Sequence, residues 1–325
     1  MTRKKKLIVV TGVKQPSVIK IVEERCKKVG AKPYRLGKDF DFKIKKVSLN
    51  GTVFDTTILS DRLKKLSNLR ISLLGRHQVE NASLAIETVF QLGKFACLPA
   101  GRDFKASEEH IRNALKTAFF PGRFEIACIK GSARPLNDSF ATGNTRAKGA
   151  GVGHDPAKRD VGSPRQRFIA RGEARPCYGY SYTLDAKPYT LVLDGAHNPT
   201  KMKAFLTTLK KLFPETKKIF IVAFKNDKDI KGMLKQILPV ADHIIITEFR
   251  VKTDTSTNAS ADALNLKSQI SNLKYCKDVK IITLKNSKMA LDKALSLLAI
   301  QQYNNSTIVV VTGSLYLVGE VRNML

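Results

Sequence analysis

Short apolar runs alternate regularly with longer segments of helical pattern from residue 189 to the C-terminus. Strands that are joined by crossover helices lie parallel, and the helices pack on both faces of the sheet. The alternation therefore predicts an α/β fold with a Rossmann-like, doubly wound and mostly parallel sheet. No G-x-G-x-x-G pattern occurs, so we predict no dinucleotide. The expected strands are residues 190–193, 219–223, 243–247, 280–284 and 307–312, and the expected helices are residues 200–212, 230–238, 261–271 and 287–300 and a last one after Ser314.

Polar side chains follow three of these strands at the point where each strand ends. Asp194, His197 and Asn198 follow the first strand in YTLVLDGAHNP. Lys228 follows the second in NDKD, and Ser314 follows the last in TGSLY. Because the carboxyl ends of parallel strands meet at one edge, where open α/β sheets bind ligands, these residues predict a single site. Its groups suit a charged, amino-acid-like substrate or a phosphate with magnesium.

The DGAHNP segment also has a purely structural interpretation. Asp194 and Asn198 are residue types that close turns and cap helices, and Pro199 suits the first turn of the helix that follows. The local pattern leaves both interpretations open. The convergence of three polar strand ends favours the ligand site over the structural role.

The N-terminal part predicts a different arrangement. Residues 7–36 are expected to form a strand, a helix and a strand, and residues 40–59 a hairpin around Asn50-Gly51. Helices are expected over residues 73–92 and from Ser107, which can cap the second one.

Three residues outside the C-terminal sheet are candidates for ligand contacts. His77 and Asn81 lie near the start of a helix in LLGRHQVENASLA, where they could meet a ligand, although a structural role fits His77 at least as well. Arg123 lies in a Pro-Gly turn, FPGRFE, where its guanidinium can bind phosphate oxygens, but a surface arginine is the alternative. The phosphate-loop pattern G-x-x-x-x-G-K-[ST] occurs nowhere in the chain.

The chain is strongly basic, with a formal net charge of +29 at pH 7 over 325 residues. Such a charge attracts polyanions, but the lysines are spread along the chain and no zinc module or RNA-binding aromatic motif accompanies them. We therefore do not expect specific nucleic-acid binding. The five scattered cysteines lack metal-ligand spacing, so no metal ligands are predicted. No apolar run approaches the roughly 20 residues that span a bilayer, and no signal peptide is recognisable, so we expect a cytoplasmic protein without a membrane partner.

Residues 127–187 differ from the rest of the chain in composition. Arginine outnumbers lysine 7 to 4 there, whereas lysine outnumbers arginine 35 to 11 elsewhere. The segment has no sustained helical or strand period and is rich in glycine, alanine and proline. It is expected to be a foreign, mostly disordered surface insertion.

Five motifs in this order resemble the folylpolyglutamate synthase/dihydrofolate synthase family of Mur-type ligases: LLGRHQVENASLA, FPGRFE, LVLDGAHNP, NDKD and VVTGSLYLVGEVR. The resemblance implies a Mur ligase C-terminal domain at residues 73–325. Residues 1–72 would then be the last part of the central ATPase domain of a Mur ligase.

This resemblance implies a mechanism and a set of site residues. ATP would phosphorylate a folate carboxylate to an acyl phosphate, which the amine of L-glutamate attacks. The matching motifs imply that Asn81, Arg123 and Asp194 bind ATP, with Arg123 neutralising phosphate charge. They further imply His197 and Lys228 as catalytic residues, with Asn198 and Ser314 on the glutamate side.

The family's P-loop, magnesium ligands and modified lysine are expected in an N-terminal region that is absent from this sequence. Three hypotheses follow. The chain could act as a ligase only with a separately encoded N-terminal ATPase portion, it could be an inactive gene fragment, or it could be a basic binding protein that reuses the fold. The sequence does not distinguish dihydropteroate from tetrahydrofolate as the substrate.

Overall fold

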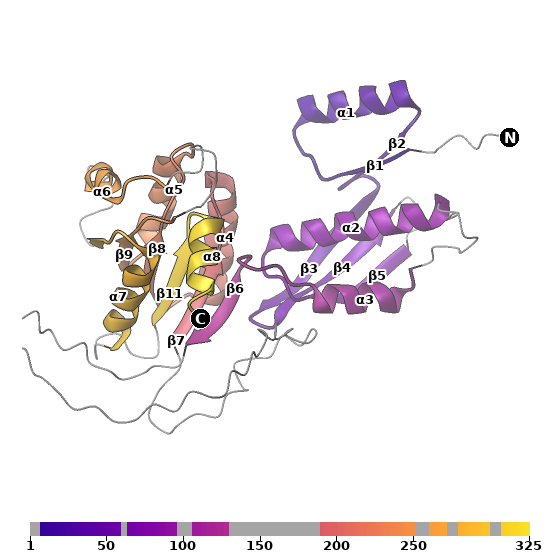
Figure 1. The fold of residues 1–325 in the computed structure, drawn as a ribbon. Coiled ribbons are helices and arrows are strands. Elements are labelled where there is room, and N and C mark those ends of the chain that lie inside the picture. The colour runs from indigo at the N-terminus through magenta and orange to yellow at the C-terminus, as the bar shows by residue number, and fades with distance from the viewer. Residues whose placement is uncertain are drawn as a thin grey trace, which may run out of the picture.

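The computed structural model describes residues 7–59, 64–95, 106–129, 189–250, 260–271, 279–299 and 307–325. Its largest element is a six-stranded sheet in the C-terminal part of the chain (Figure 1). The strand order is β10-β9-β8-β11-β7-β6, and all neighbours are parallel except β6 and β7. The strands are β6 (Glu125–Ile129), β7 (Tyr189–Asp194), β8 (Lys217–Val222), β9 (His243–Ile246), β10 (Lys280–Thr283) and β11 (Thr307–Thr312).

Helices cover both faces of this sheet. Successive strand residues alternate between two hydrophobic cores, as Leu191 and Leu193 enter one core and Val192 enters the other. The core around Val192 contains residues of α4, α5 and α6, and the opposite core contains residues of α7 and α8. The predicted doubly wound α/β fold is therefore confirmed. The helices are α4 (Pro199–Leu212), α5 (Ile230–Ile237), α6 (Ala263–Ser271), α7 (Ser287–Ala299) and α8 (Leu315–Arg322), with a short 3₁₀ helix at Leu238–Val240.

Strands β6 and β7 form an antiparallel pair at the edge of the sheet. Ile129, the last residue of β6, lies opposite Tyr189, the first residue of β7. The two described residues that flank positions 130–188 are therefore neighbours in the sheet. Residues 127–129 belong to β6, and the remainder of the segment predicted as an insertion lies outside the described residues.

A second, antiparallel sheet contains β3 (Phe40–Ser48), β4 (Gly51–Ile58) and β5 (Lys64–Ile71) in that order. The predicted hairpin is confirmed, with Ser48 paired to Gly51 across the turn. Two helices, α2 (Arg76–Phe95) and α3 (Glu108–Thr117), share one hydrophobic core with β4 and β5. The helices α2 and α3 follow residue 72 in the chain, whereas the strands of this sheet precede it, so the core contains residues from both sides of the predicted domain boundary. The boundary at residue 72 stays a prediction.

The sequence pattern gave no indication of strand β5, and a bulge explains why. Leu66, Leu69 and Ile71 are its buried apolar residues, so the expected spacing of two is interrupted between Leu66 and Leu69. Asn68 has a φ of 56°, in the left-handed region, and the pairing with β4 shifts register here. An extra residue in a strand breaks the alternation on which prediction depends.

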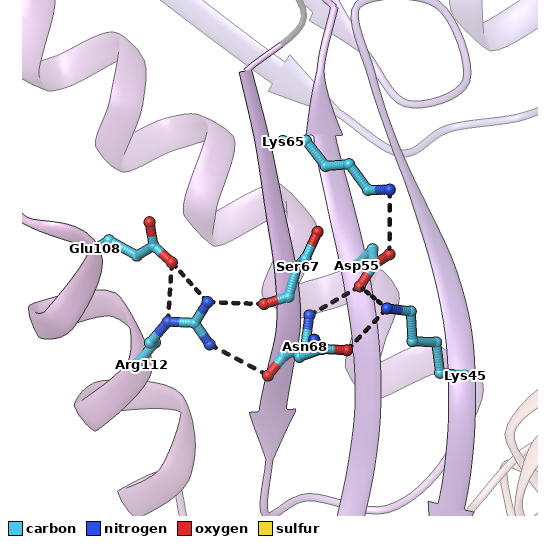
Figure 2. Close-up of polar contacts among 7 residues, drawn as sticks. All are labelled: Lys45, Asp55, Lys65, Ser67, Asn68, Glu108 and Arg112. Carbon is cyan, nitrogen blue, oxygen red and sulfur yellow. Dashed lines mark hydrogen bonds and ion pairs between the residues drawn. The ribbon is translucent and has the colours of Figure 1, made fainter.

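Asp55 on β4 holds this bulge in place (Figure 2). Its carboxylate accepts the backbone N–H of Asn68 at 2.8 Å and pairs with Lys45 at 2.9 Å and Lys65 at 3.5 Å. Burial by itself would raise the pKa of Asp55, but the Asn68 N–H and the two ammonium groups together hold that pKa below its usual value. From the other side, Arg112 of α3 donates to the carbonyl oxygen of Asn68 at 3.2 Å.

The first elements form a small β-α-β unit, as predicted. β1 (Ile8–Thr11) and β2 (Lys32–Arg35) pair in parallel and are connected by α1 (Pro16–Val29). The unit exposes apolar side chains, including Leu7 at 52% and Ile21 at 65%. Among the helices that the structure describes, none combines the length and the apolar character needed to cross a bilayer.

Candidate functional site

The DGAHNP segment connects the carboxyl end of β7 to α4. Leu191–Leu193 are fully buried in the centre of the sheet, so the chain leaves the core at Asp194. Asn198 caps α4, because its Oδ1 accepts the N–H of Lys201 at 2.9 Å, and Pro199 occupies the first turn. The predicted capping role of Asn198 is therefore confirmed, and a contact with substrate would be additional to it.

The FPGRFE turn is bound directly to DGAHNP. The N–H of Gly195 donates to the carbonyl oxygen of Gly122 at 2.9 Å, and the N–H of Phe124 donates to Oδ2 of Asp194 at 2.9 Å. Phe124 has a φ of 47°, which is unusual for a bulky side chain, and its buried ring lies 5.4 Å from that of Phe205. These contacts bring Arg123 next to the end of β7, although residues 130–188 separate the two motifs in sequence.

Glu125 anchors the same turn to the last helix. Its Oε2 accepts the N–H of Gly122 at 2.9 Å, and its two oxygens accept from Nε of Arg322 at 3.0 and 3.2 Å. Arg322 belongs to α8, so the motifs FPGRFE and VVTGSLYLVGEVR are physically connected. This connection fixes the backbone on either side of Arg123.

Asp194 is 5% exposed and unusually placed for a carboxylate. Oδ2 accepts from Phe124 and Oδ1 accepts the N–H of Ala196 at 2.8 Å. Burial raises the pKa of Asp194 to about 6, even though these N–H groups and the nearby Arg123 and Lys201 favour the charged form. Its visible role is to join two loops, and a contact with a nucleoside stays a prediction.

Cationic side chains gather around this carboxylate. Burial lowers the pKa of Lys201, and the positive charges of Arg123 and Lys228 lower that pKa further, whereas Asp194 opposes them. Arg123 also adds to the effect of burial in lowering the pKa of His77. One electrostatic environment is therefore shared by side chains from four places in the chain: His77 near the start of α2, Lys201 near the start of α4, Arg123 in FPGRFE and Lys228 after β8.

Arg123 is available for a ligand. Within the part of the chain that the structure describes, its guanidinium makes no hydrogen bond or ion pair, and it lies 5.6 Å from the ring centroid of Phe120. A guanidinium in this state keeps its planar donor fork for other acceptors, and the geometry of that fork matches the oxygens of a phosphate.

His197 has a partner on each ring nitrogen. Nδ1 lies 2.8 Å from the carbonyl oxygen of Gly195, and Nε2 lies 3.1 Å from Nζ of Lys201, one helical turn further along. The sequence analysis did not identify Lys201. The signal that could have found it is the i, i+4 spacing from His197 together with the absence of an acidic residue in the first turn of α4.

The ends of β8 and β11 complete the edge. Lys228 pairs with Asp227 at 2.8 Å, and Asp229 caps α5 through the N–H of Gly232 at 2.8 Å. Ser314 is 2% exposed and caps α8 through the N–H of Tyr316 at 3.2 Å. A pocket of about 340 Å³ opens beside Lys228. Its polar lining consists of Asn226, Lys228, Asp229, Lys231, Asp262 and Asn265.

Asn81 lies in the second turn of α2 and is exposed, and its amide donates to Oε1 of Gln78 at 3.4 Å. Gly75, just before this helix, has a φ of 108° and lies against α4, since a Cβ atom there would be 3.1 Å from the hydroxyl of Thr208. This close approach packs the backbone just before α2 against the later half of α4.

Comparisons with known proteins agree with this arrangement. Residues 179–324 match the family model described as the C-terminal domain of dihydrofolate synthetase. Dihydrofolate synthetase of Saccharomyces cerevisiae is 22% identical over 288 residues, which cover 86% of this chain and 64% of that protein. Dihydrofolate synthase/folylpolyglutamate synthase of Bacillus subtilis is 22% identical over 318 residues, which cover 98% of this chain and 54% of that protein.

A solved structure shows the same fold. Folylpolyglutamate synthase of Mycobacterium tuberculosis complexed with ADP superposes with a TM-score of 0.65 at 20% identity, covering 98% of this chain and 54% of that one. The chain thus spans between half and two thirds of the length of these relatives. The resemblance predicted from the motifs is confirmed: the chain is similar to the folylpolyglutamate synthase/dihydrofolate synthase family, and its residues 179–324 match the model of the dihydrofolate synthetase C-terminal domain.

Proposed function

We propose that this chain takes part in the ATP-dependent addition of glutamate to a folate through an acyl phosphate. The supporting observation is the convergence of Arg123, Lys201 and Lys228 at the carboxyl edge of the C-terminal sheet. Transfer of a phosphoryl group to a carboxylate brings several negative charges together, and fixed cations stabilise such a transition state.

Each predicted residue has a proposed role in this reaction. Arg123 binds phosphate oxygens, while Asn81 and Asp194 lie towards the nucleoside. His197 and Lys228 act closest to the reacting groups. Asn198 and Ser314 lie towards the incoming glutamate. Both residues also cap helices, and these capping hydrogen bonds hold their side chains in place.

The pocket beside Lys228 suits an amino acid such as glutamate. Two lysines and two aspartates line it, so it offers cations for carboxylates and carboxylates for an ammonium group. Its volume of about 340 Å³ lies within the range of small-molecule sites. Lys228 lines this pocket and also adds to the positive charge around Lys201. An amine bound in the pocket would therefore face a phosphate that Arg123 binds.

The described residues fit the phosphates of ATP but not a magnesium site. Arg123 has an available donor fork, whereas no group of three histidine, cysteine or acidic side chains comes together in the described part of the chain. The family resemblance implies magnesium ligands in an N-terminal ATPase portion, and no step is assigned to the ion here.

The β1-α1-β2 unit offers a surface for that portion. Among the described residues, no third strand joins the parallel sheet of β1 and β2 on either edge, and parallel sheets are normally covered. The exposed side chains of Leu7 and Ile21 add apolar area to the same unit. A partner that extends this sheet would bury both features.

The test is phosphate release from ATP in the presence of L-glutamate and either dihydropteroate or tetrahydrofolate. We expect release only when the chain is mixed with a P-loop-bearing portion encoded by the same genome, and loss of release with Arg123→Gln but not with Lys203→Gln on an exposed face of α4. No release by the folded mixture would support the inactive-fragment hypothesis and contradict the proposal. Release by the chain alone would refute the need for a partner.

The binding-protein hypothesis has its own readout. If the function of the net charge of +29 is to bind nucleic acid, the chain should be retained on generic DNA at physiological salt. We expect retention to vanish there, because non-specific phosphate contacts weaken steeply as salt rises.

A further inference from the structure

The tip of the β3–β4 hairpin carries an asparagine that is directly followed by a glycine. Leu49 and Asn50 form the turn and are exposed, and Gly51 begins β4 opposite Ser48. Gly51 has a φ of 118°, and a Cβ atom there would lie 2.5 Å from the carbonyl oxygen of Ile71. A side chain does not fit at this position, so the fold itself requires the glycine after Asn50.

A glycine after an asparagine leaves the side chain of that asparagine open to attack from the backbone. The nitrogen of the following residue can approach the side-chain Cγ atom most closely when that residue has no Cβ atom. Among the described residues, none makes a hydrogen bond to the side-chain amide of Asn50, which is exposed. The Cγ atom of Asn50 is therefore free to turn towards the nitrogen of Gly51.

Arg70 binds the peptide group that would react. Its Nε and Nη2 donate to the carbonyl oxygen of Asn50 at 3.1 and 2.7 Å. This oxygen belongs to the same peptide group as the nitrogen of Gly51. When that nitrogen loses its proton, the negative charge spreads onto the oxygen, and a guanidinium held there stabilises the charge as fixed donors stabilise an oxyanion.

The hairpin can open at its tip without losing this contact. Gly51 pairs with Ser48 of β3, so the two residues must separate locally before the nitrogen attacks. Arg70 and Ile71 belong to β5, which lies on the other side of β4. Separation of Ser48 from Gly51 therefore leaves the guanidinium on the reacting peptide group.

We propose that Asn50 deamidates spontaneously in the folded chain and that Arg70 promotes the reaction. The nitrogen of Gly51 gives its proton to solvent and forms a bond to Cγ of Asn50. The bond from Cγ to the amide nitrogen breaks, and this nitrogen takes up a proton from solvent and leaves as ammonia. Water then adds to one of the two carbonyl groups of the five-membered ring and opens it to aspartate or isoaspartate. This modification site is independent of the proposed function.

The two products differ in their effect on the hairpin. Aspartate places a carboxylate beside the guanidinium of Arg70, and the backbone keeps its length. Isoaspartate adds one methylene group to the backbone before Gly51, which displaces the pairing of Gly51 with Ser48. Either product adds one negative charge to the chain.

The test follows conversion in the full chain at physiological pH and temperature. Mass spectrometry of the tryptic peptide of residues 47–62 measures it, and Asn81, which is exposed and followed by Ala82, gives the background in the same digest. We expect Asn50 to convert faster than Asn81. Arg70→Gln should slow the conversion of Asn50 by at least about threefold, a modest factor because the contact is exposed. Arg25→Gln makes the same charge change at an exposed position of α1 and should have no effect.

The unfolded chain separates the contact from the local sequence. In concentrated urea the wild type and Arg70→Gln should convert at the same rate, because the guanidinium no longer lies on the peptide group. Equal rates for the two folded proteins, with folding checked by circular dichroism, would refute the role of Arg70. Faster conversion of folded Arg70→Gln would show that the contact protects Asn50, which is the opposite of the proposal. Conversion of Asn50 no faster than that of Asn81 in the folded wild type would refute the modification site itself.

Discussion

Replacing Asp194 by Asn should change how stability depends on pH. The carboxyl has a raised pKa of about 6 in the folded chain, against 3.8 for an ordinary aspartate. Between these two values the folded state binds a proton that the unfolded state has released, so stability falls as pH rises. At about 1.36 kcal/mol per unit, the total loss is about 3 kcal/mol, complete above pH 6.

Asparagine has no charge to desolvate, so Asp194→Asn should not show this loss. At low pH the variant should be less stable than the wild type, because its amide nitrogen cannot accept a hydrogen bond and either Phe124 or Ala196 loses an acceptor, at about 1–3 kcal/mol. As pH rises from 4.5 to 7, the variant should gain about 2 kcal/mol relative to the wild type.

Urea unfolding followed by circular dichroism at several pH values measures this difference directly. Asp292→Asn, at an exposed position on α7, is the control and should show no such trend. A difference between the wild type and Asp194→Asn that stays constant within about 0.5 kcal/mol from pH 4.5 to 7 would refute the reasoning, because single-proton linkage requires the slope.

Three further predictions concern packing and backbone geometry. Gly195→Ala should destabilise the chain by about 1–3 kcal/mol in the same assay, since the new Cβ would lie 2.1 Å from Cδ2 of Leu315, and a smaller residue at 315 should relieve the defect. Asn68→Val should lose about 1–3 kcal/mol at a φ of 56°, whereas Asn68→Gly should be close to neutral. Asp55→Asn should destabilise the chain at pH 7 and progressively less as pH falls below the ordinary aspartate value, because a carboxyl with a lowered pKa stabilises the fold only while it is ionised.

The C-terminal sheet could be predicted because its signals are local. Each buried strand is a short apolar run, and Asn198, Asp229 and Ser314 mark the starts of the following helices. Strand β5 could not be predicted, because its bulge at Asn68 is stabilised by Asp55, a residue on another strand. A register shift that depends on a distant side chain leaves no periodic trace in its own segment.

The candidate site was predictable in its components but not in its connections. The motifs located Arg123, Asp194 and Lys228, because their positions follow from strand ends and a Pro-Gly turn. The hydrogen bonds that join FPGRFE to DGAHNP, and the link from Glu125 to Arg322, depend on three-dimensional proximity. Lys201 was overlooked because its i, i+4 spacing from His197 stands out only once the contact between the two side chains is known, in a chain where lysines are frequent on helices.

The pairing of Ile129 with Tyr189 has a consequence for engineering. These residues lie at the end of β7 opposite to Asp194, so a segment joined there starts about 17 Å from the site at 3.3–3.4 Å per strand residue. Extending a connection from about five to sixty residues costs only about 2 kcal/mol of closure entropy. This edge is therefore a natural grafting position, where a short turn or a fluorescent reporter domain could replace residues 130–188 while the end of the sheet that carries Asp194 stays intact.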